Sequence, residues 1–186
     1  MVVHTSGKDV DYIIDLHNIG LFCSQKTPGQ LILNIFDAVA ALRDNDVPVI
    51  SGFHSHMEKE CLKILLRGSQ PIIVCPARSI KDYRYPTEWK KPIKENRLTM
   101  VSDFANDVRR VTTETADHRN HFLINITDHF FIPYAAVGGK TEGLAKEIIT
   151  MGKPLYTIIH ELNKNLIALS ANPIEDFINM KSRNKS

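Results

Sequence analysis

The 186-residue sequence has few cysteines, no long apolar run and little net charge. Its three cysteines, Cys23, Cys61 and Cys75, are odd in number and form no Cys-x-x-Cys pair, which argues against a disulfide framework and indicates reduced thiols. No apolar run approaches about 20 residues, and the first residues lack the apolar segment of a signal peptide, so we expect no membrane span and a cytoplasmic location. A net charge of +2 does not by itself indicate a nucleic-acid-binding protein, so only local clustering of charge could do so.

The composition is that of an ordinary globular protein, with 43% apolar and 24% charged residues. The length suits one domain with a substantial core. We expect an N-terminal extension over residues 1–18, one folded domain over residues 19–178, and a frayed tail over residues 179–186.

Apolar segments alternate with segments of helical spacing along most of the chain. The segments predicted as strands are residues 19–23, 47–50, 71–75, 98–101, 130–137 and 155–159. The segments predicted as helices are residues 31–42, 58–67, 108–128, 142–151, 166–169 and 174–180. Residues 12–14 fit either a helix or an edge element. This alternation predicts an α/β fold, a doubly wound and mostly parallel sheet with helices on both faces.

A glycine-rich turn, Gly138-Gly139-Lys140-Thr141, joins a predicted strand to a predicted helix. Glycines allow a close approach of the backbone, and the N-terminus of the following helix presents free N–H groups, so we expect an anion there. The last three residues match the end of a P-loop, but Tyr134 stands where the first glycine of that loop belongs. We therefore favour Lys140 as a simple anion contact.

Three predicted strands end in loops that carry small or hydroxyl residues with glycine, namely residues 24–29, 51–57 and 138–141. Ligands of doubly wound sheets bind beyond the C-terminal ends of the strands, so these loops favour a nucleotide-like ligand. The alternative is that tight turns simply need small residues. His54 and His56, beside Glu58 and Cys61, raise the question of a metal site, but no second pair of ligands is evident and we predict none.

The segment from residue 78 to 97 combines basic and aromatic side chains. Its aromatic residues are Tyr83, Tyr85 and Trp89. The basic residues that we expect to contact nucleic acid are Arg78, Lys81, Arg84, Lys90 and Lys91. Basic groups follow a phosphate backbone while aromatic rings stack on bases, as single-stranded nucleic acid requires. The alternative is a solvated face whose aromatic rings pack on the domain or on a second subunit.

Several motifs resemble those of the DNA-processing protein A (DprA/Smf) family, in the same order along residues 20–177. Ser51-Gly52-Phe53-His54, followed by a helix with Glu58, resembles its Ser-Gly-x-Ala-x-Gly-Ile-Asp loop. Tyr85-Pro86 resembles its Tyr-Pro, and Arg119-Asn120 resembles the start of its Arg-Asn helix. Gly139-Lys140-Thr141 and Gly152-Lys153-Pro154-Leu155 resemble its Ser-Gly-Ser-Leu-x-Thr-Ala and Gly-Arg-x-Val segments.

This resemblance implies a Rossmann-like domain of the SLOG superfamily, which includes single-stranded-DNA-binding processing proteins and cytokinin-activating phosphoribohydrolases. It also implies a homodimer. Ser24-Gln25 replaces the Thr/Ser-Arg of the DNA-processing proteins, and the complete Pro-Gly-Gly-x-Gly-Thr-x-x-Glu signature of the phosphoribohydrolases is absent. Glu58 and Glu142 are the only candidates for a catalytic acid.

We predict a protein that binds a nucleotide or single-stranded nucleic acid, DNA in particular, in a cleft at the strand ends. The alternatives are a nucleoside 5'-monophosphate phosphoribohydrolase and a homodimeric partner-binding module. No cofactor is firmly implied beyond a bound nucleotide or phosphate. The predicted ligand-binding residues are Ser24, Ser51, Gly52, Phe53, His54, Arg119, Asn120, Gly138, Gly139, Lys140 and Thr141. For Arg119, a surface salt bridge to Asp117 or Glu114 is an equally open interpretation.

Overall fold

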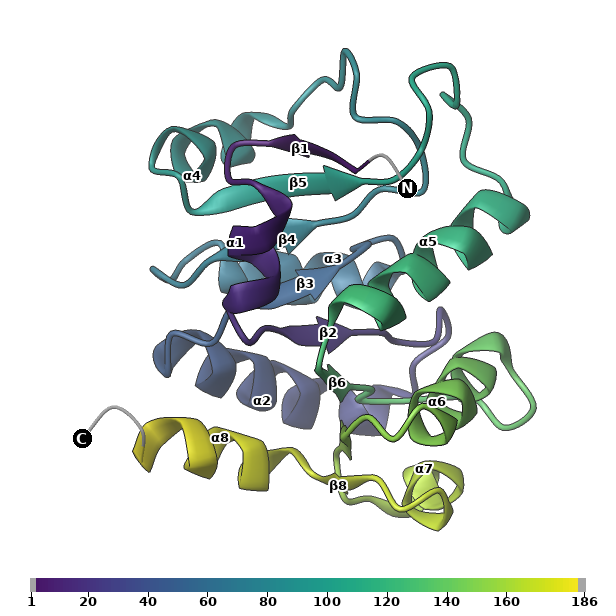
Figure 1. Cartoon of the computed structure of the whole chain (residues 1–186). Coiled ribbons are helices and arrows are strands. Elements are labelled where there is room, and N and C mark those ends of the chain that lie inside the picture. Colours follow the sequence, from purple (N-terminus) through teal and green to yellow (C-terminus); the bar gives the residue numbers. More distant parts are fainter. Residues whose placement is uncertain (1–2, 184–186) are drawn as a thin grey trace.

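The fold is built on one sheet of eight strands in the order β1-β5-β4-β3-β2-β6-β7-β8 (Figure 1). The computed structural model describes residues 3–183. The strands are β1 (His4–Ser6), β2 (Ile19–Leu21), β3 (Val49–Ser51), β4 (Ile72–Val74), β5 (Leu98–Ser102), β6 (His129–Phe131), β7 (Leu155–Thr157) and β8 (Asn172–Pro173). Neighbouring strands are parallel throughout, except that β1 pairs with β5 in the antiparallel direction.

Helices cover both faces of this sheet. They are α1 (Val10–Asp15), α2 (Ile32–Asp44), α3 (His56–Leu65), α4 (Lys90–Lys94), α5 (Thr113–Ile126), α6 (Lys140–Thr150), α7 (Lys164–Ala168) and α8 (Ile174–Arg183), with short 3-10 turns at Gly29–Leu31, Thr87–Trp89 and Glu161–Asn163. Buried side chains of α2, α3 and α8 form one apolar core, and those of α1, α5, α6 and α7 form a second. Figure 1 shows α1 and α5 crossing in front of the strands, with α3 behind them.

Successive strand residues supply these two cores in turn, as the pleat of a strand requires. In β4, Ile72 and Val74 belong to the first core, whereas Ile73 belongs to the second. Fully buried strands of this kind are typical of parallel sheets whose faces are both covered. The predicted fold class, a doubly wound and mostly parallel α/β sheet, is confirmed.

The direction of winding changes between β2 and β6. From β2 the chain winds outward through β3, β4 and β5, and α5 then leads it back to β6 on the other side of β2. The connections after β2 and β6 lead to α2 and α6 on opposite faces of the sheet, and a crevice for a ligand forms at such a point in doubly wound folds.

The predicted strand over residues 130–137 is too long, because β6 ends at Phe131. Pro133 has no N–H to donate to a sheet, and the chain turns away from the sheet there. Side-chain amides hold the loop that follows: Asn163 Nδ2 donates to the Pro133 carbonyl and Asn165 Nδ2 to the Ala135 carbonyl. The apolar run therefore reflects burial of this loop, since Ala135 is fully buried.

Three other boundaries differ from the prediction. Helix α5 begins at Thr113 because Thr112 caps it, with its hydroxyl accepting from the backbone N–H of Thr115. Residues 3–18 of the predicted N-terminal extension contribute to the sheet and the core, since β1 pairs with β5 and Ile13 of α1 is fully buried, whereas residues 1–2 lie outside the described residues. The predicted tail is helical to Arg183, and its last residues, 184–186, lie outside the described residues.

Candidate functional site

Two clefts open beside the C-terminal ends of the strands. The larger, about 900 Å³, lies at the change of winding direction and is lined by the loops after β2 and β3, the loop before α5, α5 itself and the first turn of α6. The smaller, about 450 Å³, lies beside the ends of β3 and β4, between α3 and the segment from residue 76 to 89. His54, Val111 and Arg119 line both clefts, so the two adjoin at these side chains.

Arg119 of α5 is a buried cation with neutral acceptors. The residue is 5% exposed, its Nη1 donates to the Cys75 carbonyl at 2.9 Å, and its Nε donates to Asn120 Oδ1 at 2.9 Å. None of the salt bridges found within residues 3–183 includes Arg119, so the alternative of a pair with Asp117 or Glu114 is wrong. A guanidinium can donate five hydrogen bonds, which leaves donors for a ligand between the clefts.

Gly52 makes the position of Arg119 possible. A Cβ atom built on Gly52 would overlap the Arg119 guanidinium, which lies directly against the backbone there. The glycine at this strand end is therefore needed for side-chain space, since its own backbone does not adopt a positive φ. The next residue, Phe53, is buried and has a φ of 45°, an unusual conformation for an aromatic residue that turns the chain sharply towards α3.

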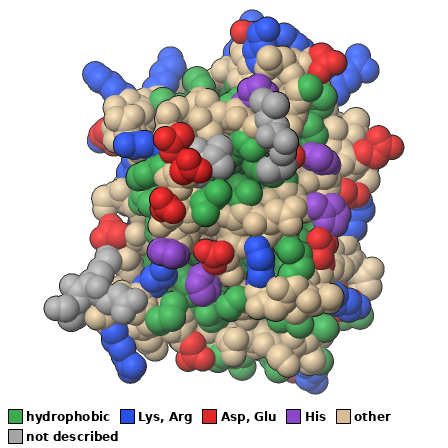
Figure 2. All heavy atoms as spheres, in the orientation of Figure 1, with side chains coloured by type: hydrophobic (Ala, Val, Ile, Leu, Met, Phe, Trp, Pro, Cys, Tyr) green, Lys and Arg blue, Asp and Glu red, His purple; other side chains and the backbone are tan. Residues whose placement is uncertain are grey.

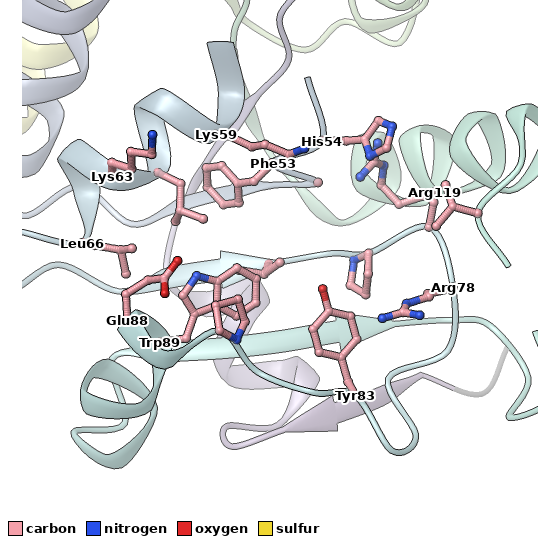
Figure 3. Close-up of a pocket in the computed structure, with 17 residues that line it drawn as sticks. Phe53, His54, Lys59, Lys63, Leu66, Arg78, Tyr83, Glu88, Trp89 and Arg119 are labelled. Carbon is pink, nitrogen blue, oxygen red and sulfur yellow. The ribbon is translucent and has the colours of Figure 1, made fainter. Parts of the chain in front are cut away.

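The smaller cleft has apolar walls and a mainly basic rim, which includes one acid, Glu88 (Figure 3). Lys59, Lys63 and Leu66 approach it from α3 and its C-terminus, and Trp89 and Tyr83 lie opposite them. The Tyr83 and Trp89 rings are almost parallel, with centroids 6.3 Å apart and an interplanar angle of 4°. The guanidinium carbon of Arg78 lies 4.6 Å from the centre of the Tyr83 ring. This arrangement can accept a flat apolar group beside an anion.

Both candidate catalytic acids hold backbone in place. Glu58 is buried, and its Oε1 accepts from the N–H of Cys23 at 3.0 Å while Oε2 accepts from the N–H groups of His54 and Ser55. Its carboxylate thus joins the loops after β2 and β3. Glu142 is also buried and accepts from Asn165, Lys146 and the N–H of Gly138.

These hydrogen bonds hold the pKa of the Glu142 carboxyl below its usual range. The bond from Asn165 contributes most, followed by those from Lys146 and Gly138. A carboxylate stabilised in this way is a poor general base, because it gives up this stabilisation when it takes a proton. The geometry thus gives both acids structural roles, Glu58 in the wall of the larger cleft and Glu142 at the glycine-rich turn.

The two predicted serines also tie loops together. Ser51 Oγ donates to the Leu21 carbonyl at 2.8 Å and accepts from the N–H of Phe53. Ser24 Oγ accepts from the N–H of Ala136 at 3.0 Å, so it links the loops after β2 and β6 across the change of winding direction. Ser24 lines the larger cleft, whereas Ser51 is fully buried beneath it.

The glycine-rich turn forms one wall of the larger cleft through Lys140 and Thr141. Gly138 has a φ of 70°, which favours glycine, and Gly139 precedes α6 without a side-chain cap. Lys140 Nζ contacts both carboxylate oxygens of Asp117 on α5, at 2.7 and 3.0 Å. The lysine predicted to contact an anion is therefore paired with an acid of this chain.

Two solved structures with the same architecture are of DNA-processing proteins. The structure of DNA processing protein A from Helicobacter pylori, studied for its single-stranded DNA binding mode, matches with a TM-score of 0.75 and 19% identity over 98% of this chain and 87% of that one. The chain has the DprA fold. DprA from Streptococcus pneumoniae matches with a TM-score of 0.73 and 12% identity over 95% of this chain. This chain spans 65% of the length of the Streptococcus pneumoniae protein.

The DprA resemblance predicted from the motifs is thus confirmed at the level of the fold. No protein-family model matches the sequence. No curated protein matches it either.

On the DprA fold, the structure brings together most of the predicted ligand-binding residues. Those that line a cleft are Ser24, Gly52, Phe53, His54, Arg119, Asn120, Lys140 and Thr141. Ser51, Gly138 and Gly139 shape the surrounding loops without lining either cleft.

Of the basic residues predicted to contact nucleic acid, Arg78 alone lines a cleft. Lys81, Arg84, Lys90 and Lys91 are exposed outside both clefts, and Lys91 lies 3.8 Å from Glu95. On the face shown in Figure 2, acidic and basic side chains are intermingled. The prediction overlooked Lys59 and Lys63, whose spacing of four residues on α3 places them on one helical face that ends at Leu66.

The three cysteines are free, as predicted, and all three are buried. Burial raises the pKa of the Cys23 thiol and that of the Cys75 thiol to about 12, which keeps both protonated at neutral pH. Within residues 3–183 no group of three or more His, Cys, Asp or Glu side chains is arranged to hold a metal ion. Every helix in the same range is too short or too polar to cross a membrane.

Proposed function

We propose that this protein binds single-stranded nucleic acid, DNA in particular, in the two adjoining clefts. Arg119 is the observation that carries the proposal, since it holds a positive charge between the clefts and its partners among residues 3–183 are a carbonyl and an amide oxygen. A buried guanidinium without a carboxylate is stabilised by an anionic ligand, and its planar fork matches a phosphate. The similarity to a Helicobacter pylori protein studied for single-stranded DNA binding supports the same ligand here.

The smaller cleft favours a single strand over a duplex. Its walls include the rings of Phe53, Tyr83 and Trp89, which suit the face of an unstacked base. The bases of a duplex are paired and stacked, so they cannot enter a cleft of about 450 Å³ without leaving the helix. We expect a base in this cleft and its phosphate on Arg119.

The lysines of α3 continue the positive charge along this cleft. Lys59 and Lys63 are exposed, and Lys63 Nζ has a solvent-accessible pair with Glu60 at 2.7 Å that a phosphate can displace. Together with Arg78 on the opposite wall, these lysines support a path for the backbone of a strand leaving Arg119.

The test compares two double variants that remove the same charge. Lys59→Ala with Lys63→Ala removes the cleft lysines, and Lys90→Ala with Lys91→Ala removes two exposed lysines of α4 outside the clefts. Loss of two phosphate contacts makes the negative slope of log K against log salt shallower by about 1.4, which corresponds to about 25-fold weaker binding near 0.1 M salt. We expect this loss for the α3 pair and a much smaller one for the α4 pair, measured by anisotropy with a labelled oligothymidylate.

Equal losses for the two pairs would show that binding responds only to net charge, and a larger loss for the α4 pair would move the binding surface to α4. A melting curve of each variant serves as the folding control. Both pairs of side chains are exposed, so neither change should alter the core.

The homodimer and the cytoplasmic location that the sequence suggested remain predictions, and sedimentation at micromolar concentration tests the first. We propose no enzymatic function, because Glu58 and Glu142 both bind backbone N–H groups and no observation favours either as a reacting group.

A further inference from the structure

An ion pair forms part of the wall of the larger cleft. Lys140, in the first turn of α6, and Asp117, on α5, both line this cleft, and the ammonium lies 2.7 and 3.0 Å from the two carboxylate oxygens. Lys140 belongs to the turn where a phosphate is expected from the sequence. In the free protein an acid of the same chain occupies that position.

The carboxylate of Asp117 has no other task among the described residues. Among the described residues it accepts hydrogen bonds from Lys140 alone, whereas Glu58, in the same cleft, accepts from three backbone N–H groups and supports two loops. Both members of the pair are accessible, with exposed side-chain fractions of 66% for Lys140 and 44% for Asp117. An exposed pair of this kind is weak and easily exchanged for another anion.

We propose that Asp117 regulates binding in the larger cleft by competing with the phosphate of the nucleic acid for Lys140. This inference rests on the proposed function. Entry of a strand requires Asp117 to leave Lys140, which then contacts a phosphate. Because an exposed pair is weak, the competition lowers the affinity for a strand by no more than about fivefold.

The competition has a second consequence, in the salt dependence of binding. When a strand displaces Asp117, the freed carboxylate attracts a cation from solution, which offsets the cation that the phosphate releases on binding Lys140. In a variant without the Asp117 carboxylate no cation is taken up, so the full release of the phosphate's cation remains. Removal of the Asp117 charge should therefore steepen the slope of log K against log salt by up to about 0.7, the value of one phosphate contact on a single strand.

A double-mutant cycle tests the proposal with the whole chain and an oligothymidylate of about 15 nucleotides, a length in the range that single-strand-binding folds cover. The variants are Asp117→Asn, Lys140→Gln and the two combined, and Asp37→Asn on α2 is a control with the same change of charge at an exposed position outside both clefts. We expect Asp117→Asn to tighten binding threefold to fivefold near 0.1 M salt. In the Lys140→Gln background we expect the same change to alter the affinity by less than about 1.5-fold, because there is then no Lys140 ammonium for which Asp117 and a phosphate could compete.

The proposal is overturned if Asp117→Asn binds like the wild type, if the gain is the same with and without Lys140, or if Asp37→Asn gives an equal gain. These outcomes are distinct from failure of the proposed function. If the wild-type protein does not bind the oligonucleotide at all, the proposed function fails and this inference with it. If the wild type binds and the cycle shows no coupling, only this inference fails.

Discussion

Replacement of Gly52 by alanine should displace the Arg119 guanidinium from its position between the clefts without changing the charge of the protein. The added methyl group would overlap the Arg119 guanidinium, which is held by its bond to the Cys75 carbonyl. The guanidinium must therefore move and give up that bond. A hydrogen bond from a charged group contributes about 1.5–3 kcal/mol, so we expect the free energy of unfolding to fall by about 2–3 kcal/mol.

The assay is a melting curve combined with an oligonucleotide titration. For a chain of this length, a loss of that size lowers the melting temperature by about 4–12 °C. Binding should weaken by at least about tenfold even though Arg119 is still present, because its guanidinium no longer lies between the clefts.

Gly143→Ala provides the matched control. Gly143 lies within α6 and has open space where its Cβ would be, so alanine there should stabilise the protein by about 1 kcal/mol and leave binding unchanged. If Gly52→Ala melted and bound like the wild type, the guanidinium would not lie against Gly52, and the reasoning about Arg119 would be refuted.

Two further predictions concern stability. Glu58→Ala should lower the free energy of unfolding by about 2–4 kcal/mol, since three backbone N–H groups lose their acceptor. Denaturant unfolding measures this change, and an unchanged midpoint would count against the role of Glu58 in joining the loops. Burial first, and then the charge of Lys181, hold the pKa of His129 below its usual range, so the unfolded chain binds this proton more readily than the folded protein. Stability should therefore decrease as the pH falls below about 6.5, and His129→Phe, which keeps ring contacts with Phe177, should flatten that decrease; equal slopes for both proteins between about pH 7 and 5 would contradict the assignment.

Periodicity in the sequence identified the central strands because they are buried on both faces and read as short apolar runs. It failed where a segment is buried without belonging to the sheet. Residues 132–135 are as apolar as a strand, yet Pro133 and two asparagine side chains make them a buried loop. The start of α5 depended on the Thr112 cap, a local hydrogen bond that the apolar pattern does not reveal.

The candidate site was only partly predictable for a related reason. Local motifs pointed to Gly52, Arg119 and Lys140, but whether a basic side chain is paired depends on contacts between distant segments. Arg119 is bound to the Cys75 carbonyl, 44 residues away, and Lys140 is paired with Asp117, 23 residues away. Lys59 and Lys63 lie four residues apart, as on any solvated helical face, and only the fold brings the segment from residue 76 to 89 opposite them across the smaller cleft.

The most direct test of the central claim is a crystal structure of the protein with a short oligothymidylate. We predict a backbone phosphate within about 3 Å of the Arg119 guanidinium nitrogens, with a base in the smaller cleft beside Tyr83 and Trp89. A strand bound along α4, with both clefts empty and Arg119 contacting only Cys75 and Asn120, would contradict it.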